Sequence, residues 1–506
     1  MRGVRPLWAD IAHTEVLLLQ LDLIITGGTV IDGSGAPGYS ADVGICNGRI
    51  AAIATPGALE HTAQRVINAD GSVVAPGFID IHAHDERIVL DEPELRHKLM
   101  QGVTTTVCGN CGSGLAPLPG DVGAALKGTD LERLFAQNQP IWPTVAEYLA
   151  AVEEQHPAIN FAYLVPHRLV RAAVMGAEET MATPEQLGQM QDIVRRAMED
   201  GAIGLSSGLF YTPGMSATHH EFVPLLEVVR EYDGYYATHM RDEGIGLLAS
   251  VAESIATARA ASIRLQISHL KGGRGPETWG LVQGACEMID EARREGLEVC
   301  GDQYPYTASS TTVAAYIRTG LVDRYARDIQ ICWSEPHPDA VGKRLDVIAE
   351  EMGVTPREAA EALLPATGVY FGISEDDMRF VMRQPWVSVG SDGVPGAPRP
   401  HPRAFGTFPR VLGHFVRGEG LLSLEEAVRK MTSLPARMCG LADRGVLHVG
   451  AVADVVVFDP DRIADVATYD DPCRYPAGIP HVVVGGEVVL RDGTVTDARA
   501  GKVLRN

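Results

Sequence analysis

Histidines, a cysteine and an aspartate stand at the ends of several apolar runs in this 506-residue chain. The run from Val73 to Ile81 leads into His82 and His84, which point to one side of a strand because side chains alternate. Imidazole, thiolate and carboxylate groups are ligands that suit zinc. The candidates that follow other runs are Cys111, His239, His269 and Asp392. Each could be an ordinary buried residue by itself, but their joint placement at strand ends predicts a metal site.

Strand-like runs alternate with helical patterns through the middle of the chain and predict an α/β fold, a TIM-like (β/α)8 barrel. Val73 to Ile81 is the first run. The others are 103–108, 159–166, 201–207, 235–240, 264–270, 298–304 and 387–392. Active sites of such barrels lie at the C-terminal ends of the strands. The ligand candidates therefore converge on one face of the predicted barrel.

Both ends of the chain read as short strands separated by turns. Residues 21–70 include the hairpin signal Asn47-Gly48, and residues 440–506 show the same pattern of short strand-like runs and turns. We expect one small β-sandwich domain formed from both termini, with a catalytic barrel over 71–439. Residues 1–20 precede this pattern as an extension, and the acidic residues ahead of the first apolar run argue against a signal peptide.

A long segment separates the last two predicted strands. Residues from about 308 to 384 exceed what one crossover helix needs, and their pattern predicts a helical insertion between strands seven and eight. An insertion there would hang over the active-site face, as a lid or as part of the substrate pocket. Trp333 and Tyr370 are candidates for shaping that pocket.

The composition restricts the partners and the compartment. A formal net charge of -22 argues against nucleic acid and anionic membranes, which repel an acidic protein. No apolar run reaches the roughly 18 residues of a membrane span. The eight cysteines are few for this length and mostly isolated, which favours reduced thiols in the cytoplasm over a disulfide framework.

The pair Cys108 and Cys111 forms a Cys-x-x-Cys motif, which also occurs in redox sites and zinc ribbons. A redox motif places its first cysteine at a helix start, but the glycines after Cys111 are poor helix formers, and the chain has no second Cys-x-x-Cys for a ribbon. We therefore favour Cys111 as a ligand in the catalytic site and Cys108 as a buried strand residue.

Several motifs together resemble a known family. Ala-Pro-Gly-Phe-Ile-Asp-Ile-His-Ala-His (75–84) resembles the first metal motif of the amidohydrolase superfamily. The motifs that resemble its N-acyl-D-amino-acid deacylase branch, the D-aminoacylases, are Gly-Asn-Cys-Gly (109–112), Gly-Leu-Ser-Ser-Gly-Leu-Phe-Tyr-Thr-Pro-Gly (204–214), Ala-Thr-His-Met-Arg-Asp-Glu-Gly (237–244), Ile-Ser-His-Leu-Lys (267–271), Gly-Ser-Asp-Gly (390–393) and His-Pro-Arg-Ala-Phe-Gly-Thr-Phe-Pro-Arg (401–410). The resemblance runs from about Leu21 to the C-terminus. Its cysteine stands where other branches use a carboxylated lysine or a glutamate.

The resemblance implies a role for each candidate. Zinc would be bound tightly by Cys111, His239 and His269. His82 and His84 would form, with the same cysteine, a second and weaker metal position, so that one or two metals act. Asp392 would be the general acid/base. The resemblance also implies that the substrate α-carboxylate is held by Lys271, Tyr304, Ser310 and Arg403, a cation-rich set apt for that task.

The function that the resemblance implies is zinc-dependent hydrolysis of small N-acyl-D-amino acids to a carboxylate and a D-amino acid. A metal-dependent cyclic amidase of dihydroorotase or hydantoinase type, or a peptidase for D-residues, is the alternative with the same barrel. A metal-free scaffold protein is a third reading, which the complete set of ligands argues against. The preferred side chain and the oligomeric state stay open at this point.

Overall fold

Parallel strands form the centre of the molecule in the computed structural model, which describes residues 20–59, 63–127 and 141–506. They pair in the orders β17-β13-β12-β11-β10-β9 and β6-β7-β8. The bounds are β6 (Phe78–Asp80), β7 (Val103–Cys108), β8 (Asn160–Tyr163), β9 (Val165–Pro166), β10 (Gly204–Gly208), β11 (Tyr235–His239), β12 (Arg264–Ile267), β13 (Val299–Gln303) and β17 (Val387–Val389). Because β8 runs on into β9 and a parallel bridge joins Ala83 to Gly393, the strands close into the (β/α)8 barrel.

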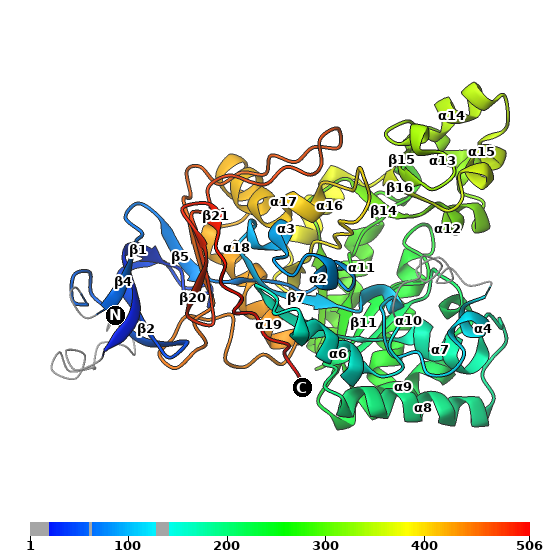
Figure 1. Ribbon diagram of the computed structural model, residues 1–506. Helices are drawn as coiled ribbons and strands as arrows, with labels where there is room; N and C mark the ends of the chain where they lie inside the picture. The colour runs from blue at the N-terminus through cyan, green and yellow to red at the C-terminus, as the bar shows by residue number, and fades with distance from the viewer. Residues whose placement is uncertain (1–19, 60–62, 128–140) are drawn as a thin grey trace.

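Helices follow the strands around the barrel (Figure 1). They are α2 (Ile88–Asp91), α3 (Arg96–Leu99), α4 (Val122–Leu126), α6 (Val145–Glu154), α7 (His167–Met175), α8 (Pro184–Glu199), α9 (His219–Glu231), α10 (Leu247–Ala261), α11 (Leu281–Arg294), α16 (Glu375–Met382), α17 (Arg403–Arg410), η6 (Val411–Gly418), α18 (Leu424–Met431) and α19 (Ser433–Met438). Local sequence explains their ends. In α8, Thr183 and Gln186 form a capping box and Pro184 takes the first helical position. No helix in the described ranges is long and apolar enough to cross a membrane.

The predicted first strand, Val73 to Ile81, is divided in two. β5 (Val73–Pro76) pairs with the sheet of the chain ends, and only β6 belongs to the barrel. The break falls at Gly77, where a side chain would lie 2.1 Å from the Thr104 hydroxyl. Residues Val73–Pro76, which lie within the predicted barrel domain of 71–439, therefore extend the terminal sheet.

Several predicted strands end earlier than expected. β12 ends at Ile267 and not at residue 270, so His269 and Lys271 both lie in the following loop. Asp392 likewise lies in a loop after β17. His82 and His84 follow β6. These candidates thus stand on short segments just beyond the strand ends, whereas His239 is the last residue of β11.

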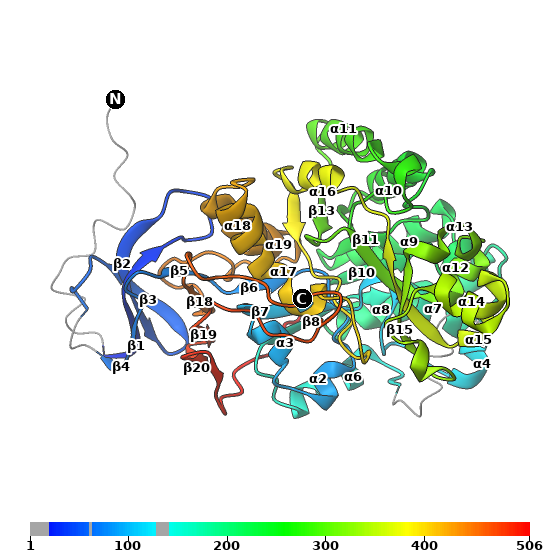
Figure 2. The same ribbon diagram turned by 90° about the horizontal axis from the view of Figure 1, so that it is seen from above.

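Strands from both ends of the chain form one nine-stranded sheet. It contains β1 (Leu21–Val30), β2 (Tyr39–Cys46), β3 (Arg49–Ala54), β4 (Ala63–Asn68), β5, β18 (Val455–Phe458), β19 (His481–Val484), β20 (Glu487–Arg491) and β21 (Thr494–Val495). β5 links the two halves, because it pairs with β1 on one side and with β18 on the other. The expected β-sandwich is thus one continuous hydrogen-bonded sheet, at the end of the molecule away from α14 (Leu345–Met352) and α15 (Pro356–Leu363) (Figures 1 and 2). Residues 1–19 lie outside the described residues.

The sequence predicts a helical insertion after β13. This prediction is incomplete, because the insertion also contains a three-stranded antiparallel sheet. Its elements are β14 (Ala308–Thr312), α12 (Val313–Arg318), α13 (Val322–Tyr325), β15 (Ile329–Ser334), α14, α15 and β16 (Ala366–Phe371). The apolar runs of β15 and β16 are short and follow helical patterns, which hid them in the sequence. The insertion has its own apolar core, to which Phe210 and Tyr211 of the barrel contribute. It is thereby packed onto the C-terminal ends of the barrel strands.

Candidate functional site

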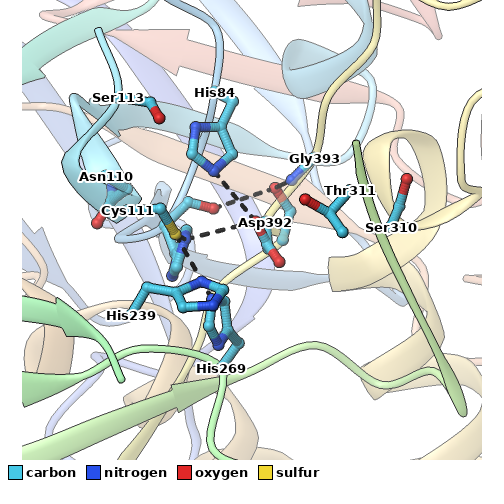
Figure 3. A network of polar contacts seen from close by, with 12 residues as sticks. His84, Asn110, Cys111, Ser113, His239, His269, Ser310, Thr311, Asp392 and Gly393 are labelled. Carbon is cyan, nitrogen blue, oxygen red and sulfur yellow. Dashed lines mark hydrogen bonds and ion pairs between the residues drawn. The ribbon is translucent and has the colours of Figure 1, made fainter. Parts of the chain in front are cut away.

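Cys111 is common to two groups of possible metal ligands at the C-terminal face of the barrel (Figure 3). One group holds His82, His84, Cys111 and Asp392, and the other holds Cys111, His239 and His269. Within each group the ligand atoms lie within 4.8 Å of one another. The Cys111 Sγ atom is 3.2 Å from His82 Nε2 and 3.5 Å from His269 Nε2. The structure therefore brings together all six residues that the sequence singled out as ligands or acid/base.

These residues fit a zinc ion. Thiolate sulfur and imidazole nitrogen are typical zinc donors, and three protein ligands leave a position open for catalysis. All three members of the second group are buried. His239 Nδ1 is a buried nitrogen with no hydrogen-bond partner in the described part of the chain. A buried polar atom of this kind costs free energy unless a ligand satisfies it, and a zinc ion held here would be such a ligand.

The charge of the site favours a thiolate at Cys111. Burial disfavours its ionisation, but the nearby imidazoles of His82 and His269 outweigh burial and lower the pKa of the Cys111 thiol well below its usual range. Cys108 behaves in the opposite way, because burial and the neighbouring Glu86 raise the pKa of its thiol well above the usual range. The two cysteines of the Cys-x-x-Cys motif thus differ in character, and only Cys111 lies among the histidines.

Three site residues have a left-handed backbone, which is uncommon outside glycine. They are Cys111 (φ 53°), His269 (φ 36°) and Asp392 (φ 48°). Such a conformation costs a non-glycine residue roughly 1–2 kcal/mol. It persists where surrounding contacts hold it and is typical of functional positions.

Two carboxylates that the sequence analysis did not single out hold the histidines. Asp302 Oδ1 accepts from the backbone N–H of His269 at 2.9 Å and lies 3.0 Å from His82 Nδ1, so it connects both ligand groups. Glu243 Oε1 lies 2.6 Å from His269 Nδ1 and 2.6 Å from Lys271 Nζ. Partners of this kind orient metal-binding imidazoles. Glu243 was visible as the last acidic residue of the Ala-Thr-His-Met-Arg-Asp-Glu-Gly motif, whereas Asp302 had no signal beyond its place on a predicted strand.

A buried lysine anchors the loop that carries Asp392. Lys98 has no exposed surface, and its Nζ donates to Asp80 Oδ2 at 2.5 Å and to Ser391 Oγ at 2.8 Å. Asp80 Oδ1 accepts from the Ser391 backbone N–H at 2.9 Å. The Asp392 N–H donates to the His82 carbonyl at 2.7 Å. The end of β6 and the loop after β17 are therefore fastened to each other, and with them the histidine pair to the aspartate.

Asp392 lies between the histidine pair and a buried arginine. Its Oδ1 is 3.2 Å from His84 Nε2 and 3.4 Å from His82 Nε2, while its Oδ2 forms an ion pair with Arg403 Nη2 at 2.8 Å. Burial would raise the pKa of Asp392, but Arg403 and His82 outweigh burial and hold it well below the usual range. Asp392 is thus a carboxylate that faces the ligand groups.

The four predicted carboxylate-binding residues occupy two layers. Lys271 and Ser310 line a cavity of about 510 Å³ that also contains Cys111, His239 and Asp392. A volume of this size suits a small molecule. Tyr304 and Arg403 lie behind this lining, with the guanidinium carbon 4.4 Å above the Tyr304 ring. The Tyr304 hydroxyl and the Nε and Nη1 of Arg403 are buried donors that make no hydrogen bond to the described residues, as expected of groups kept for an anion.

Aromatic side chains form another wall of the cavity. Phe210, Tyr211, Tyr316 and Trp333 are among the lining residues. Tyr370 stands behind Tyr316 and stacks on it with 3.8 Å between ring centroids. The insertion therefore contributes to the cavity, with Trp333 at its surface and Tyr370 in support.

A closed parallel barrel with a histidine, cysteine and aspartate cluster at its C-terminal face defines a metal-dependent hydrolase of the amidohydrolase type. The model of the Amidohydrolase family matches residues 65–319 and 215–490. The chain belongs to this family, and within it to the N-acyl-D-amino-acid deacylases, the D-aminoacylases, as the following relatives show.

An N-acyl-D-glutamate deacylase of Alcaligenes xylosoxydans xylosoxydans is 43% identical over 96% of this chain and 97% of its own length. The N-acyl-D-glutamate deacylase of Bordetella bronchiseptica, solved with zinc and a phosphonate mimic of the tetrahedral intermediate, is 42% identical. It has a TM-score of 0.91 and covers 96% of this chain and 100% of that one. A D-aminoacylase structure described by its binuclear metal centre, with activation by one metal and attenuation by the second, is 39% identical. Its TM-score is 0.89, with 96% and 100% covered.

Proposed function

We propose that this protein hydrolyses the amide bond of N-acyl-D-amino acids and releases a carboxylate and a free D-amino acid. The observation that carries the proposal is the position of Asp392, with one oxygen toward His82 and His84 and the other on Arg403. The Asp392 carboxylate thereby connects the possible metal ligands with Arg403, a cation that suits the carboxylate of a substrate. An amide bond placed over Cys111 has its reacting atoms next to Asp392.

Asp392 is the group that we propose to move protons. It lines the same cavity as Cys111, His239 and His269. As a carboxylate it accepts a proton from the attacking water, and it returns that proton to the amide nitrogen as the amine departs. The bond between the carbonyl carbon and the amide nitrogen breaks, and the oxygen atom of the attacking water remains in the carboxylate product.

Cys111, His239 and His269 are the residues that we propose to hold the tighter zinc ion, and His82 and His84 a second, weaker one. Zinc bound there supplies Lewis acidity, which polarises the amide carbonyl and makes water more acidic. The chain contributes the orientation of the ligands through Asp302 and Glu243. The similar D-aminoacylase, described as having a binuclear centre in which one metal activates and the second attenuates, supports this division.

The α-carboxylate of the substrate is proposed to bind Lys271, Ser310, Tyr304 and Arg403. Lys271 and Ser310 already border the cavity, and Arg403 has two donors without a hydrogen-bond partner among the described residues. A guanidinium and an ammonium together recognise a carboxylate by charge and by hydrogen bonds.

We further propose that the protein acts in the cytoplasm, because all eight cysteines are free thiols, as in reducing compartments.

One assay tests the proposed function. The purified zinc-loaded chain is offered matched N-acetyl-D- and N-acetyl-L-amino acids with acidic, apolar and aromatic side chains, and the release of primary amine is followed. We expect turnover of D-substrates and little of their L-forms. Absence of amine release from every D-substrate contradicts the proposal, and turnover of hydantoins by the same preparation favours a cyclic amidase instead.

A further inference from the structure

Ser206 lies on β10, between β9 and β11, and is completely buried. It stands 95 residues after Cys111 in the chain, but its side chain reaches the loop that carries this cysteine. The Gly112 N–H donates to Ser206 Oγ at 3.0 Å, and Ser206 Oγ in turn donates to the Gly109 carbonyl. One hydroxyl therefore bonds the backbone on both sides of Cys111, using its single proton and one acceptor position.

The loop that Ser206 holds has a left-handed backbone, which glycine adopts freely but which strains Cys111. Gly109, Cys111 and Gly112 all have positive φ values, of 82°, 53° and 64°. The loop is also pressed against β10, since a side chain on Gly208 would lie 2.1 Å from the Cys111 carbonyl oxygen. A backbone of this kind keeps its shape only while surrounding contacts determine it. Ser206 makes two of those contacts.

Other groups fix the remaining parts of the loop. Glu86 Oε1 accepts from the Gly109 N–H at 2.7 Å, and the Asn110 side chain donates to the carbonyls of Val107 and Ile81. These contacts fasten the loop to β7 and to the segment that follows β6. Ser206 alone among these side chains fastens it to β10, which pairs directly with the β11 strand that ends in His239. It thus sets Cys111 relative to His239.

We propose that Ser206 is a positioning residue for the metal-binding thiolate, which keeps Cys111 Sγ at a distance from His239 and His269 that suits zinc. The inference rests on the proposed role of Cys111 as a zinc ligand. Without the hydroxyl, the Gly112 N–H and the Gly109 carbonyl lose their partner, and the loop can relax away from β10. The zinc affinity then falls, although every ligand is still present.

Ser207 offers a matched control. It is also a fully buried serine on β10, but its side chain points the other way, as neighbours on a strand do. Its Oγ bonds the Tyr236 hydroxyl at 2.8 Å and the Thr238 hydroxyl at 2.9 Å. Ser207→Ala therefore removes as many buried hydrogen bonds as Ser206→Ala without touching the loop of Cys111.

The experiment compares five full-length proteins: wild type, Ser206→Ala, Ser207→Ala, Ser206→Thr and Cys111→Ala. Zinc affinity is measured by competition with a chromogenic chelator, and Co²⁺-loaded samples are examined for the thiolate-to-cobalt absorption band. We expect Ser206→Ala to bind zinc about 10- to 100-fold more weakly and to alter the cobalt band, as loss of a ligand-orienting partner does. Ser207→Ala and Ser206→Thr, which keeps the hydroxyl, are expected to stay near wild type.

The outcomes separate this inference from the proposed function. Equal zinc affinity and cobalt spectra of Ser206→Ala and Ser207→Ala overturn the role of Ser206. Equal weakening by the two alanine variants does the same, because it shows a general loss of packing. If Cys111→Ala binds zinc as well as wild type, the proposed metal site itself fails. Circular dichroism and thermal unfolding of each variant verify that the protein is folded.

Discussion

The guanidinium of Arg403 forms an ion pair with Asp392, a residue that lines the cavity, with Nη2 and Oδ2 2.8 Å apart. Arg403 also donates to the Ser310 carbonyl at 3.4 Å and lies over the Tyr304 ring. The residue proposed to bind the substrate carboxylate therefore touches the proposed acid/base directly. Substrate binding and proton transfer share one arginine, and a change at Arg403 must affect both.

Arg403→Met should lower kcat/KM for N-acetyl-D-amino acids about 10- to 100-fold, because a charged hydrogen bond contributes about 1.5–3 kcal/mol and 1.4 kcal/mol is tenfold. Arg399→Met is the control, since Arg399 pairs with the exposed Asp470. Steady-state kinetics on one substrate panel compares the two. Equal activity of Arg403→Met and wild type would exclude Arg403 from the site.

Cys111→Ala should remove most of the zinc, because this sulfur belongs to both ligand groups. Cys108→Ala should keep it, since Cys108 is buried on β7 with its pKa raised. Elemental analysis after purification without chelators gives the zinc content of each. Loss of zinc from Cys108→Ala with retention of zinc in Cys111→Ala would show that Cys108, and not Cys111, is the metal ligand.

Asp392→Asn should reduce kcat about 10²- to 10⁴-fold, the usual contribution of a general acid/base. The zinc content should be retained, because Cys111, His239 and His269 form a group without Asp392. The exposed Asp376→Asn serves as a control for surface charge. A variant that loses zinc and activity together would make Asp392 a required ligand.

Gly208→Ala should destabilise the protein by about 1–3 kcal/mol, because its new methyl would overlap the Cys111 carbonyl oxygen. Gly188→Ala, in an open position of α8, should instead stabilise it by about 0.5–1 kcal/mol. Urea unfolding monitored by circular dichroism measures both. Similar stabilities would mean that the loop of Cys111 adapts readily.

The buried triad of Glu221, His167 and Arg171 should make the stability of this region depend on pH. Burial raises the pKa of Glu221, but the His167 hydrogen bond and Arg171 outweigh burial and lower it. A lowered carboxyl pKa stabilises the folded state above the unfolded value, about 4.3, and this contribution disappears as pH falls through the folded value. Glu221→Gln should therefore be less stable than wild type at pH 7 by about 3 kcal/mol, with a smaller difference at pH 4.

Thermal or urea unfolding of Glu221→Gln and wild type across pH 4–7 tests this dependence. Glu231→Gln is the comparison, because Glu231 forms its ion pair with Arg195 on the surface. A difference between Glu221→Gln and wild type that stays constant with pH would show that packing, rather than charge, accounts for the effect.

Local patterns in the sequence determined the succession of barrel strands and the ligand-type residues at their ends. A run such as Val103–Cys108 is apolar throughout because both faces of a parallel strand are buried, so it is readable without the fold. The motifs around His82, His239 and His269 are equally local, and each lies within a few residues of its strand. The branch of the amidohydrolase family followed from these motifs, in particular from Cys111.

Tertiary structure alone decided the contacts between motifs. Asp302 reaches His82 across 220 positions, Lys98 reaches Ser391 across 293, and Ser206 reaches the loop of Cys111 from a separate strand. No periodicity encodes such pairs, because they arise when the barrel closes and brings distant strand ends together. The same closure splits the first predicted strand at Gly77 and seats Arg403 on Asp392. The ligand-type residues could thus be identified from the sequence, whereas the closure of the barrel determines which of them are in contact.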